Sequence, residues 1–206
     1  MRKSIILLSW VLIASGGYLA WRGASDYYES VESQRVEALN WENQNPEQTS
    51  SDASPVPARI DLRRAKANGA QSRYSPGESL AKLSIPRLST VLYVLEGTDD
   101  NNLKRGPGHL EGSVMPGRAG NCVIAGHRDT HFRILKNITR GDEILIQSRQ
   151  GTYRYKVTGT SVVSPDNTDS LQPTSKAVLN LITCFPFNYV GSAPRRFVVH
   201  ADLIQS

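Results

Sequence analysis

Short apolar segments separated by turn residues make up the chain from residue 78 onward. Residues 80–85 alternate between apolar and polar side chains and stop at Pro86, as expected of a half-buried strand. Further segments that predict strands lie at 91–95, 122–125, 143–147, 152–157, 178–183 and 196–200. Within this part of the chain, a short helix is expected at 131–138. Many short strands with turn punctuation predict an all-β domain at 78–206, built as a barrel or a sandwich.

The first 23 residues have a different pattern. Arg2 and Lys3 precede an uncharged run of 18 residues from Ser4 to Trp21. A bilayer span needs about 20 apolar residues, so this run is close to the minimum length. Its tryptophan and tyrosine residues suit a membrane interface, and the preceding basic pair favours a cytoplasmic N-terminus. The pattern predicts a transmembrane signal anchor at 1–23, with the rest of the chain outside the cytoplasm. A cleaved signal peptide is the alternative, although its small-residue site is weak.

Residues 24–77 connect these two parts and contain no strand pattern. Apolar positions in 24–43 suit a short amphipathic helix, and a partly ordered stalk is the alternative interpretation. Residues 44–58 are rich in Asn, Gln, Ser and Pro, a composition that cannot bury a core and is typical of a linker. Residues 59–77 are basic, and their sequence pattern does not favour one type of structure. We therefore expect 24–77 to form an extracytoplasmic stalk and linker.

Composition narrows the function classes. The chain has 206 residues, of which 39% are hydrophobic and 21% charged, as in ordinary globular proteins. Its net charge of +5 is spread as +1 over residues 1–77 and +4 over residues 78–206, so a nucleic-acid partner is not expected. Two cysteines cannot build a disulfide scaffold, although a single bridge stays open. No Gly-rich phosphate loop or Cys-x-x-Cys pair occurs, and we expect no cofactor and no metal.

Two segments carry candidate chemistry. Cys184 and His127 each follow an apolar segment, where a side chain would leave the core and meet a loop. A cysteine nucleophile needs a base or a cation beside it, and this pair provides a thiol and a base. A lone cysteine is more often a small buried hydrophobe, and we expect that role for Cys122, which lies inside a predicted strand. His131 and His200 are expected to be incidental.

These segments resemble the sortases, cysteine transpeptidases of bacterial cell surfaces. The family motif Thr-Leu-x-Thr-Cys has its counterpart in Asn-Leu-Ile-Thr-Cys at 180–184, which departs only at its first position. The family histidine corresponds to His127 in Gly-His-Arg-Asp. The family arginine precedes an apolar strand directly, which selects Arg196, with Arg195 as the reserve. The segment 185–194 is most like that of class D sortases.

The resemblance implies a closed eight-stranded β-barrel and a membrane-anchored enzyme. Cys184 would be the nucleophile on a Leu-Pro-x-Thr-Gly-like sorting signal, His127 the acid and base, and Arg196 an oxyanion or substrate contact. Thr183, His109 and Asp129 are candidate substrate contacts, with structural roles about equally expected for His109 and Asp129. The implied partners are surface proteins that carry the signal, an amine acceptor and the membrane. The acceptor would be a cell-wall precursor or another protein. A cysteine hydrolase of the same fold and a tethered non-catalytic binding module are the alternatives.

Overall fold

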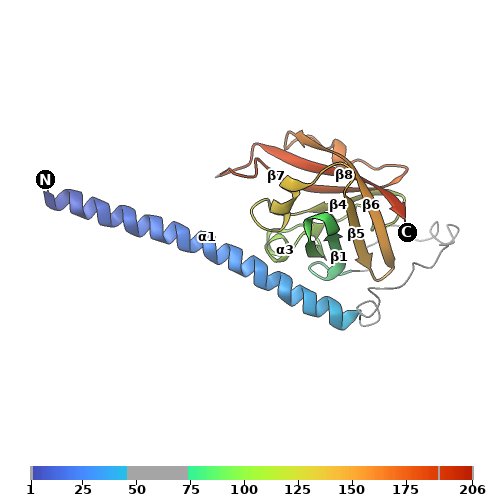
Figure 1. Cartoon of the computed structure of the whole chain (residues 1–206), viewed down its shortest axis with the longest axis horizontal. Helices are drawn as coiled ribbons and strands as arrows, with labels where there is room; N and C mark the ends of the chain where they lie inside the picture. The colour runs from blue at the N-terminus through green and yellow to red at the C-terminus, as the bar shows by residue number, and fades with distance from the viewer. Residues whose placement is uncertain (1, 46–73, 190, 206) are drawn as a thin grey trace.

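The computed structural model describes residues 2–45, 74–189 and 191–205. Figure 1 shows a long N-terminal helix lying against a barrel of strands. The strands are β1 (Ser79–Ile85), β2 (Thr90–Glu96), β3 (Gly108–His109), β4 (Gly120–Ala125), β5 (Glu143–Ser148), β6 (Gly151–Val163), β7 (Ala177–Phe185) and β8 (Arg195–Gln205). The helices are α1 (Arg2–Gln44), α3 (Asp100–Arg105) and the short 3-10 helices η2 (Pro86–Leu88), η3 (His131–Asn137) and η4 (Asp169–Leu171).

The eight strands close into a barrel in the order β1-β2-β3-β4-β7-β8-β6-β5. Most neighbours are antiparallel, but β2 with β3 and β4 with β7 are parallel. Leucine, isoleucine and tyrosine side chains fill the interior, and Tyr155 and Phe132 are the largest fully buried ones in the described residues. The prediction of an all-β barrel is therefore confirmed. β6 and β8 extend six and five residues beyond the predicted 152–157 and 196–200.

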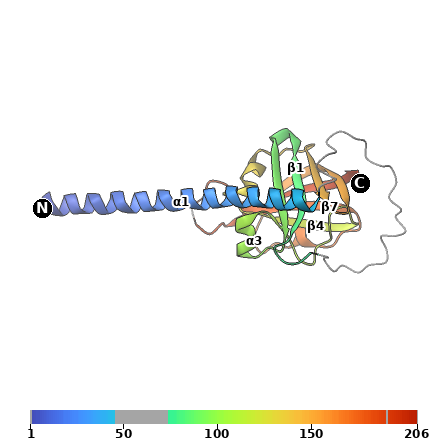
Figure 2. The same ribbon diagram turned by 90° about the horizontal axis from the view of Figure 1, so that it is seen from below.

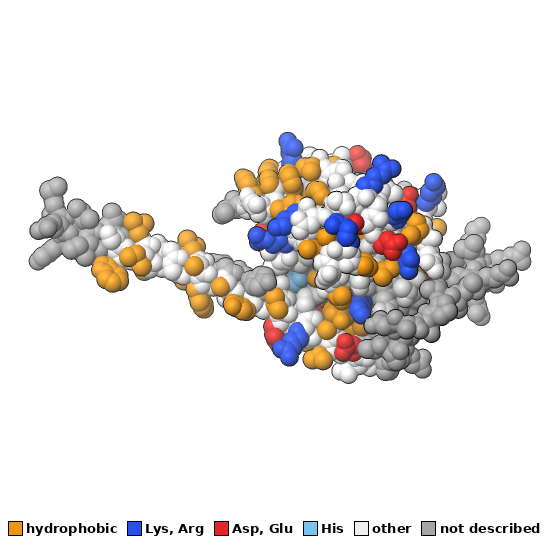
Figure 3. Space-filling model, in the orientation of Figure 1, with side chains coloured by type: hydrophobic (Ala, Val, Ile, Leu, Met, Phe, Trp, Pro, Cys, Tyr) orange, Lys and Arg blue, Asp and Glu red, His pale blue; other side chains and the backbone are white. Residues whose placement is uncertain are grey.

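Helix α1 is one continuous helix of 43 residues, about 65 Å long, where the sequence predicted an anchor followed by a separate short helix. Its first half projects away from the barrel and exposes apolar side chains (Figures 1 and 3). Among the described residues, no helix is both long and apolar enough for a bilayer span. Of the expected stalk, 24–45 is thus helical, whereas residues 46–73 lie outside the described part.

The second half of α1 packs across the barrel, as Figure 2 shows from below. Ser30, Glu37, Trp41 and Asn45 are buried, and Gln34 is partly buried. Ser30, Gln34, Glu37 and Trp41 are three or four residues apart and so lie on one side of α1, and Asn45 directly follows the end of the helix. This part of the chain is therefore attached to the domain along its length.

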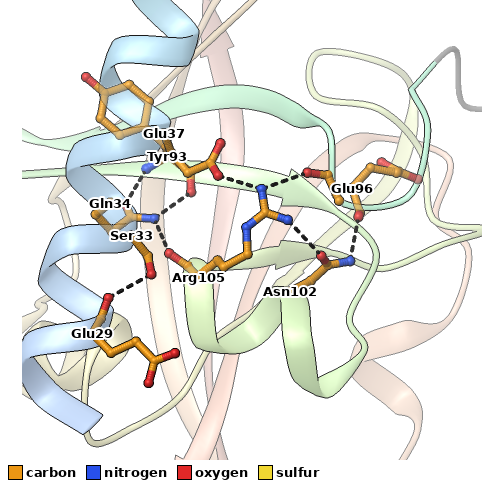
Figure 4. Close-up of polar contacts among 9 residues, drawn as sticks. Glu29, Ser33, Gln34, Glu37, Tyr93, Glu96, Asn102 and Arg105 are labelled. Atoms are coloured by element: carbon orange, nitrogen blue, oxygen red, sulfur yellow. Dashed lines mark hydrogen bonds and ion pairs between the residues drawn. The ribbon is translucent and has the colours of Figure 1, made fainter. Parts of the chain in front are cut away.

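Polar contacts fix this interface (Figure 4). The Gln34 amide donates to the Tyr93 carbonyl at 3.2 Å and accepts from the Tyr93 amide at 2.8 Å. It also donates to the carbonyl of Arg105 at 2.8 Å. The Arg105 guanidinium donates to the buried Glu37 carboxylate at 2.5 Å. Gln34 thereby pairs backbone groups of β2 that face away from β1, and so covers an open strand edge.

Candidate active site

Strand register brings three predicted residues to one end of the barrel. In the parallel pair β4 and β7, Ala125 lies opposite Ile182, and the Gly126 amide donates to the Ile182 carbonyl at 3.1 Å. The next step along both chains leads to His127 and Cys184. In the antiparallel pair β7 and β8, Cys184 lies directly opposite Arg196. Opposite residues in an antiparallel pair have Cβ atoms about 5 Å apart on one face, so Cys184 and Arg196 are neighbours on the same face. His127 lies two residues beyond Ala125, just past the end of β4, at the same end of the barrel.

Cys184 lies on the outer face of the barrel. Its neighbours Leu181 and Thr183 point inward and are buried, whereas Cys184 is partly exposed. Both cysteines of the chain are free thiols. Cys122 is 1% exposed within the core, as expected, and its burial, with Glu96 nearby, raises the pKa of its thiol far above the ordinary value. Cys184 is therefore the accessible sulfur of this domain.

His127 is held by its backbone where β4 leaves the sheet. Its carbonyl accepts from the amide of Phe132 at 3.0 Å, which ties it to the first turn of η3. Gly126 before it lies against the Phe132 ring, and a Cβ at that position would approach the ring to 2.8 Å. Only glycine fits this close approach. The glycine in the Gly-His pair therefore lets the histidine backbone pass over a buried aromatic ring.

The register separates the two candidate arginines. Arg196 pairs with Cys184, while Arg195 pairs with Phe185. Because successive residues of a strand point to opposite faces, Arg196 shares the face of Cys184 and Arg195 does not. The Arg196 guanidinium donates to the carbonyls of Arg195 at 3.2 Å and Ala193 at 3.4 Å, which uses one of its nitrogens. The structure thus favours Arg196, as the sequence motif did.

Two of the three expected substrate contacts, Thr183 and His109, have buried side chains. The Thr183 side chain points inward, is 3% exposed and donates to the Gly126 carbonyl at 2.7 Å. His109 is 1% exposed, with Nδ1 at 2.9 Å from the Glu96 carboxylate and Nε2 at 3.0 Å from the Ser113 hydroxyl. The polar groups of both side chains thus have partners inside the protein. Each links neighbouring parts of the barrel.

The third expected contact, Asp129, lies beside an arginine that sequence analysis did not select. The Asp129 carboxylate accepts from Nε of Arg128 at 3.3 Å and is 66% exposed. Arg128 is 7% exposed and donates to three carbonyls of the β7–β8 loop, those of Pro186 at 3.3 Å, Tyr189 at 2.8 Å and Gly191 at 2.9 Å. Its guanidinium also lies 5.7 Å from the Tyr189 ring centre. Arg128 thus fixes the loop that connects Cys184 to Arg196.

Of the two histidines expected to be incidental, His131 lies next to this site. It is buried, its Nε2 lies 3.2 Å from the Ser30 hydroxyl of α1 and 3.3 Å from the Lys104 carbonyl, and burial lowers its pKa. His131 therefore joins η3 to α1. Within the described ranges, no three His, Cys, Asp or Glu side chains are grouped to share a metal ion.

Comparison with known proteins agrees with the fold and identifies the family. The sortase domain model matches residues 83–204. Sortase D of Bacillus subtilis is 35% identical over 66% of this chain and 70% of its own length, and Sortase A of Bacillus anthracis is 28% identical over 97% and 91%. Among solved structures, a Clostridium perfringens Sortase D5 transpeptidase superimposes with a TM-score of 0.59 at 30% identity, covering 65% of this chain and 83% of that one. The predicted likeness to class D agrees with two of these relatives. The chain belongs to the sortase family of cysteine transpeptidases.

Proposed function

We propose that this sortase cleaves a Leu-Pro-x-Thr-Gly-like sorting signal and transfers the protein that carries it to an amine acceptor at the cell surface. The observation that supports this most strongly is the strand register, which pairs Cys184 with Arg196 and pairs Ala125, two residues before His127, with Ile182, two residues before Cys184. A nucleophile, a proton carrier and a fixed cation on one exposed face are the parts that acyl transfer requires.

In the first half-reaction, the Cys184 thiolate attacks the threonine carbonyl carbon. The guanidinium of Arg196 donates hydrogen bonds to the resulting oxyanion or to the adjacent substrate backbone. The carbon–nitrogen bond to glycine then breaks, and His127 gives its proton to the departing amine. A thioester between the threonine carbonyl and the Cys184 sulfur is left on the enzyme.

In the second half-reaction, an acceptor amine attacks the thioester carbon. His127 takes the proton that the amine loses as the new amide forms. The carbon–sulfur bond breaks, and Cys184 returns to its thiolate form. The acceptor is a cell-wall precursor or a second protein, and residues 1–23 would hold the enzyme at the membrane with its catalytic domain outside the cytoplasm.

Peptide-library cleavage followed by mass spectrometry tests this proposal. Wild-type protein with an added amine should yield a threonine amide of that amine, and Cys184→Ala should abolish all cleavage. Cys122→Ala serves as the matched control, because it removes the other thiol and leaves the exposed sulfur in place. Turnover that survives in Cys184→Ala would contradict the proposal. Cleavage to the free acid under every acceptor would favour the cysteine hydrolase, and no faster labelling of Cys184 than in denatured protein would favour a binding module.

A further inference from the structure

Asn180 occupies the one position at which the sequence departs from the usual sortase motif. It is 6% exposed on the outer face of β7, four residues before Cys184 on the same side of the strand. Its carboxamide donates to Asn121 Oδ1 on β4 at 2.7 Å and to the Ser170 carbonyl at 3.0 Å. Its own oxygen lies 2.7 Å from Nδ1 of His200 on β8. Asn180 therefore lies at the centre of a polar network across three strands.

The donor and the acceptor of each hydrogen bond around His200 follow from the chemistry of its partners. The Ser161 hydroxyl lies 2.8 Å from Nε2 of His200. Because an amide oxygen only accepts, His200 carries its proton on Nδ1, donates it to Asn180 and accepts from Ser161. Burial lowers the pKa of His200, which favours this neutral form.

The network ends on the β6–β7 loop, which comprises residues 164–176. The Asn121 amide donates to the carbonyls of Ser170 and Gln172 at 2.8 and 3.0 Å, so with Asn180 it supplies three hydrogen bonds to this loop. Asn121 is 4% exposed. Buried amides without partners are costly, so the loop and the two asparagines hold each other in place.

This loop borders the face on which the reaction takes place. Together with β4, β7 and β8 it encloses a partly open cavity of about 330 Å³, whose lining includes Asp169, Gln172, Val178, Asn180 and His200. Asn180 precedes Cys184 by four positions along β7, a distance of about 13 Å. An extended peptide of four residues has the same length. A substrate whose threonine carbonyl lies at Cys184 can therefore reach the cavity with the residues that precede it.

We propose that Asn180 and Asn121 are positioning residues, which hold the β6–β7 loop in place to bind the substrate segment that precedes the cleaved bond. This inference rests on the proposed function. The two asparagines act through the loop and do not touch the reacting atoms, so their loss should weaken substrate binding and leave the chemistry of Cys184 unchanged.

Asn121→Asp is the sharpest test, because it keeps the shape and the acceptor oxygen but removes both donors to the loop. Hydrogen exchange of residues 164–176 in the full chain should accelerate about tenfold or more. KM for a sorting-signal peptide should rise by a similar factor, with kcat within threefold. The rate of Cys184 alkylation by iodoacetamide, which needs no loop, should stay unchanged. Asn180→Thr, which restores the usual motif residue and leaves the two Asn121 donors, should give a smaller change of the same kind.

Asn101→Asp, an exposed asparagine on α3, is the matched control and should behave as wild type. Unchanged exchange of the loop in both network variants would overturn the inference, as would a loss in kcat with constant KM. Failure of wild-type protein to cleave any sorting-signal peptide would instead count against the proposed function. Even in that case the exchange measurement decides whether the two asparagines anchor the loop.

Discussion

Arg128 offers the most direct test of how the β7–β8 loop serves the site. Arg128→Met keeps much of the length of the side chain but removes every donor. Toward the loop, the wild-type guanidinium makes two short hydrogen bonds, to Tyr189 and Gly191, and one longer one, to Pro186. A hydrogen bond to a charged group contributes about 1.5–3 kcal/mol when buried. Tyr189 and Gly191 belong to an exposed part of the loop, so water replaces part of this energy.

We expect the loop conformation seen in the structure to lose about 2 kcal/mol of stabilisation, which corresponds to a roughly thirtyfold decrease in its population relative to other loop conformations. Because this loop connects Cys184 to Arg196, kcat/KM for peptide transfer should fall by about the same factor. Arg128→Lys should recover little of it, since one ammonium group cannot reach three separated carbonyls.

The assay is amine-dependent transpeptidation at several peptide concentrations, with hydrogen exchange of residues 186–194 measured on the same samples. Arg133→Met is the control, because Arg133 is an exposed arginine on the nearby η3. A kcat/KM within threefold of wild type for Arg128→Met would refute this reasoning. So would unchanged exchange in the loop, since the effect is expected to act through its position.

Three further predictions concern the support of the site. Gly126→Ala should lower the free energy of unfolding by about 1–3 kcal/mol, because the new methyl group meets a buried ring, and both the melting temperature and the activity should fall with it. Gly159→Ala is the control, because its methyl group has open space and neither quantity should change. Asp142→Asn should lower stability by about 1 kcal/mol at pH 7. Arg87 lowers the pKa of Asp142, so the deficit relative to wild type should disappear as the pH falls below about 4 through that depressed value in thermal melts. Glu37→Gln should speed hydrogen exchange in the second half of α1 by about tenfold, and equal exchange would show that its ion pair does not hold the helix.

Much of the barrel was predictable because its strands carry strong local patterns. Seven of the eight strands match apolar segments of the sequence, from 80–85 to 196–200. β3 was not predictable, since two residues hold no periodicity and their pairing depends on β2 and β4. The docking of α1 was also hidden, because a mixed set of serine, glutamine, glutamate and tryptophan makes the contact in place of an apolar stripe.

The candidate site shows the same division. Cys184, His127 and Arg196 were selected from motifs, and the register pairs Cys184 with Arg196 and brings the end of β4, just before His127, beside β7. The motif alone does not show that the Thr183 side chain is buried, because adjacent strand residues face opposite ways and Thr183 therefore points away from the face of Cys184. The partner of His109 lies thirteen residues away on another strand, so its burial depends on long-range pairing that local pattern cannot reveal.

The parallel pairing of β4 with β7 also limits how this enzyme can be altered in length. Removal of one residue from either strand would shift the residues that follow it by about 3.3 Å and turn their side chains to the other face. His127 and Cys184 would then no longer share a surface. Insertions in the segments 164–176 and 186–194 leave that pairing intact. Grafted loops that change which peptides are accepted therefore belong in those two segments, while both strands keep their exact number of residues.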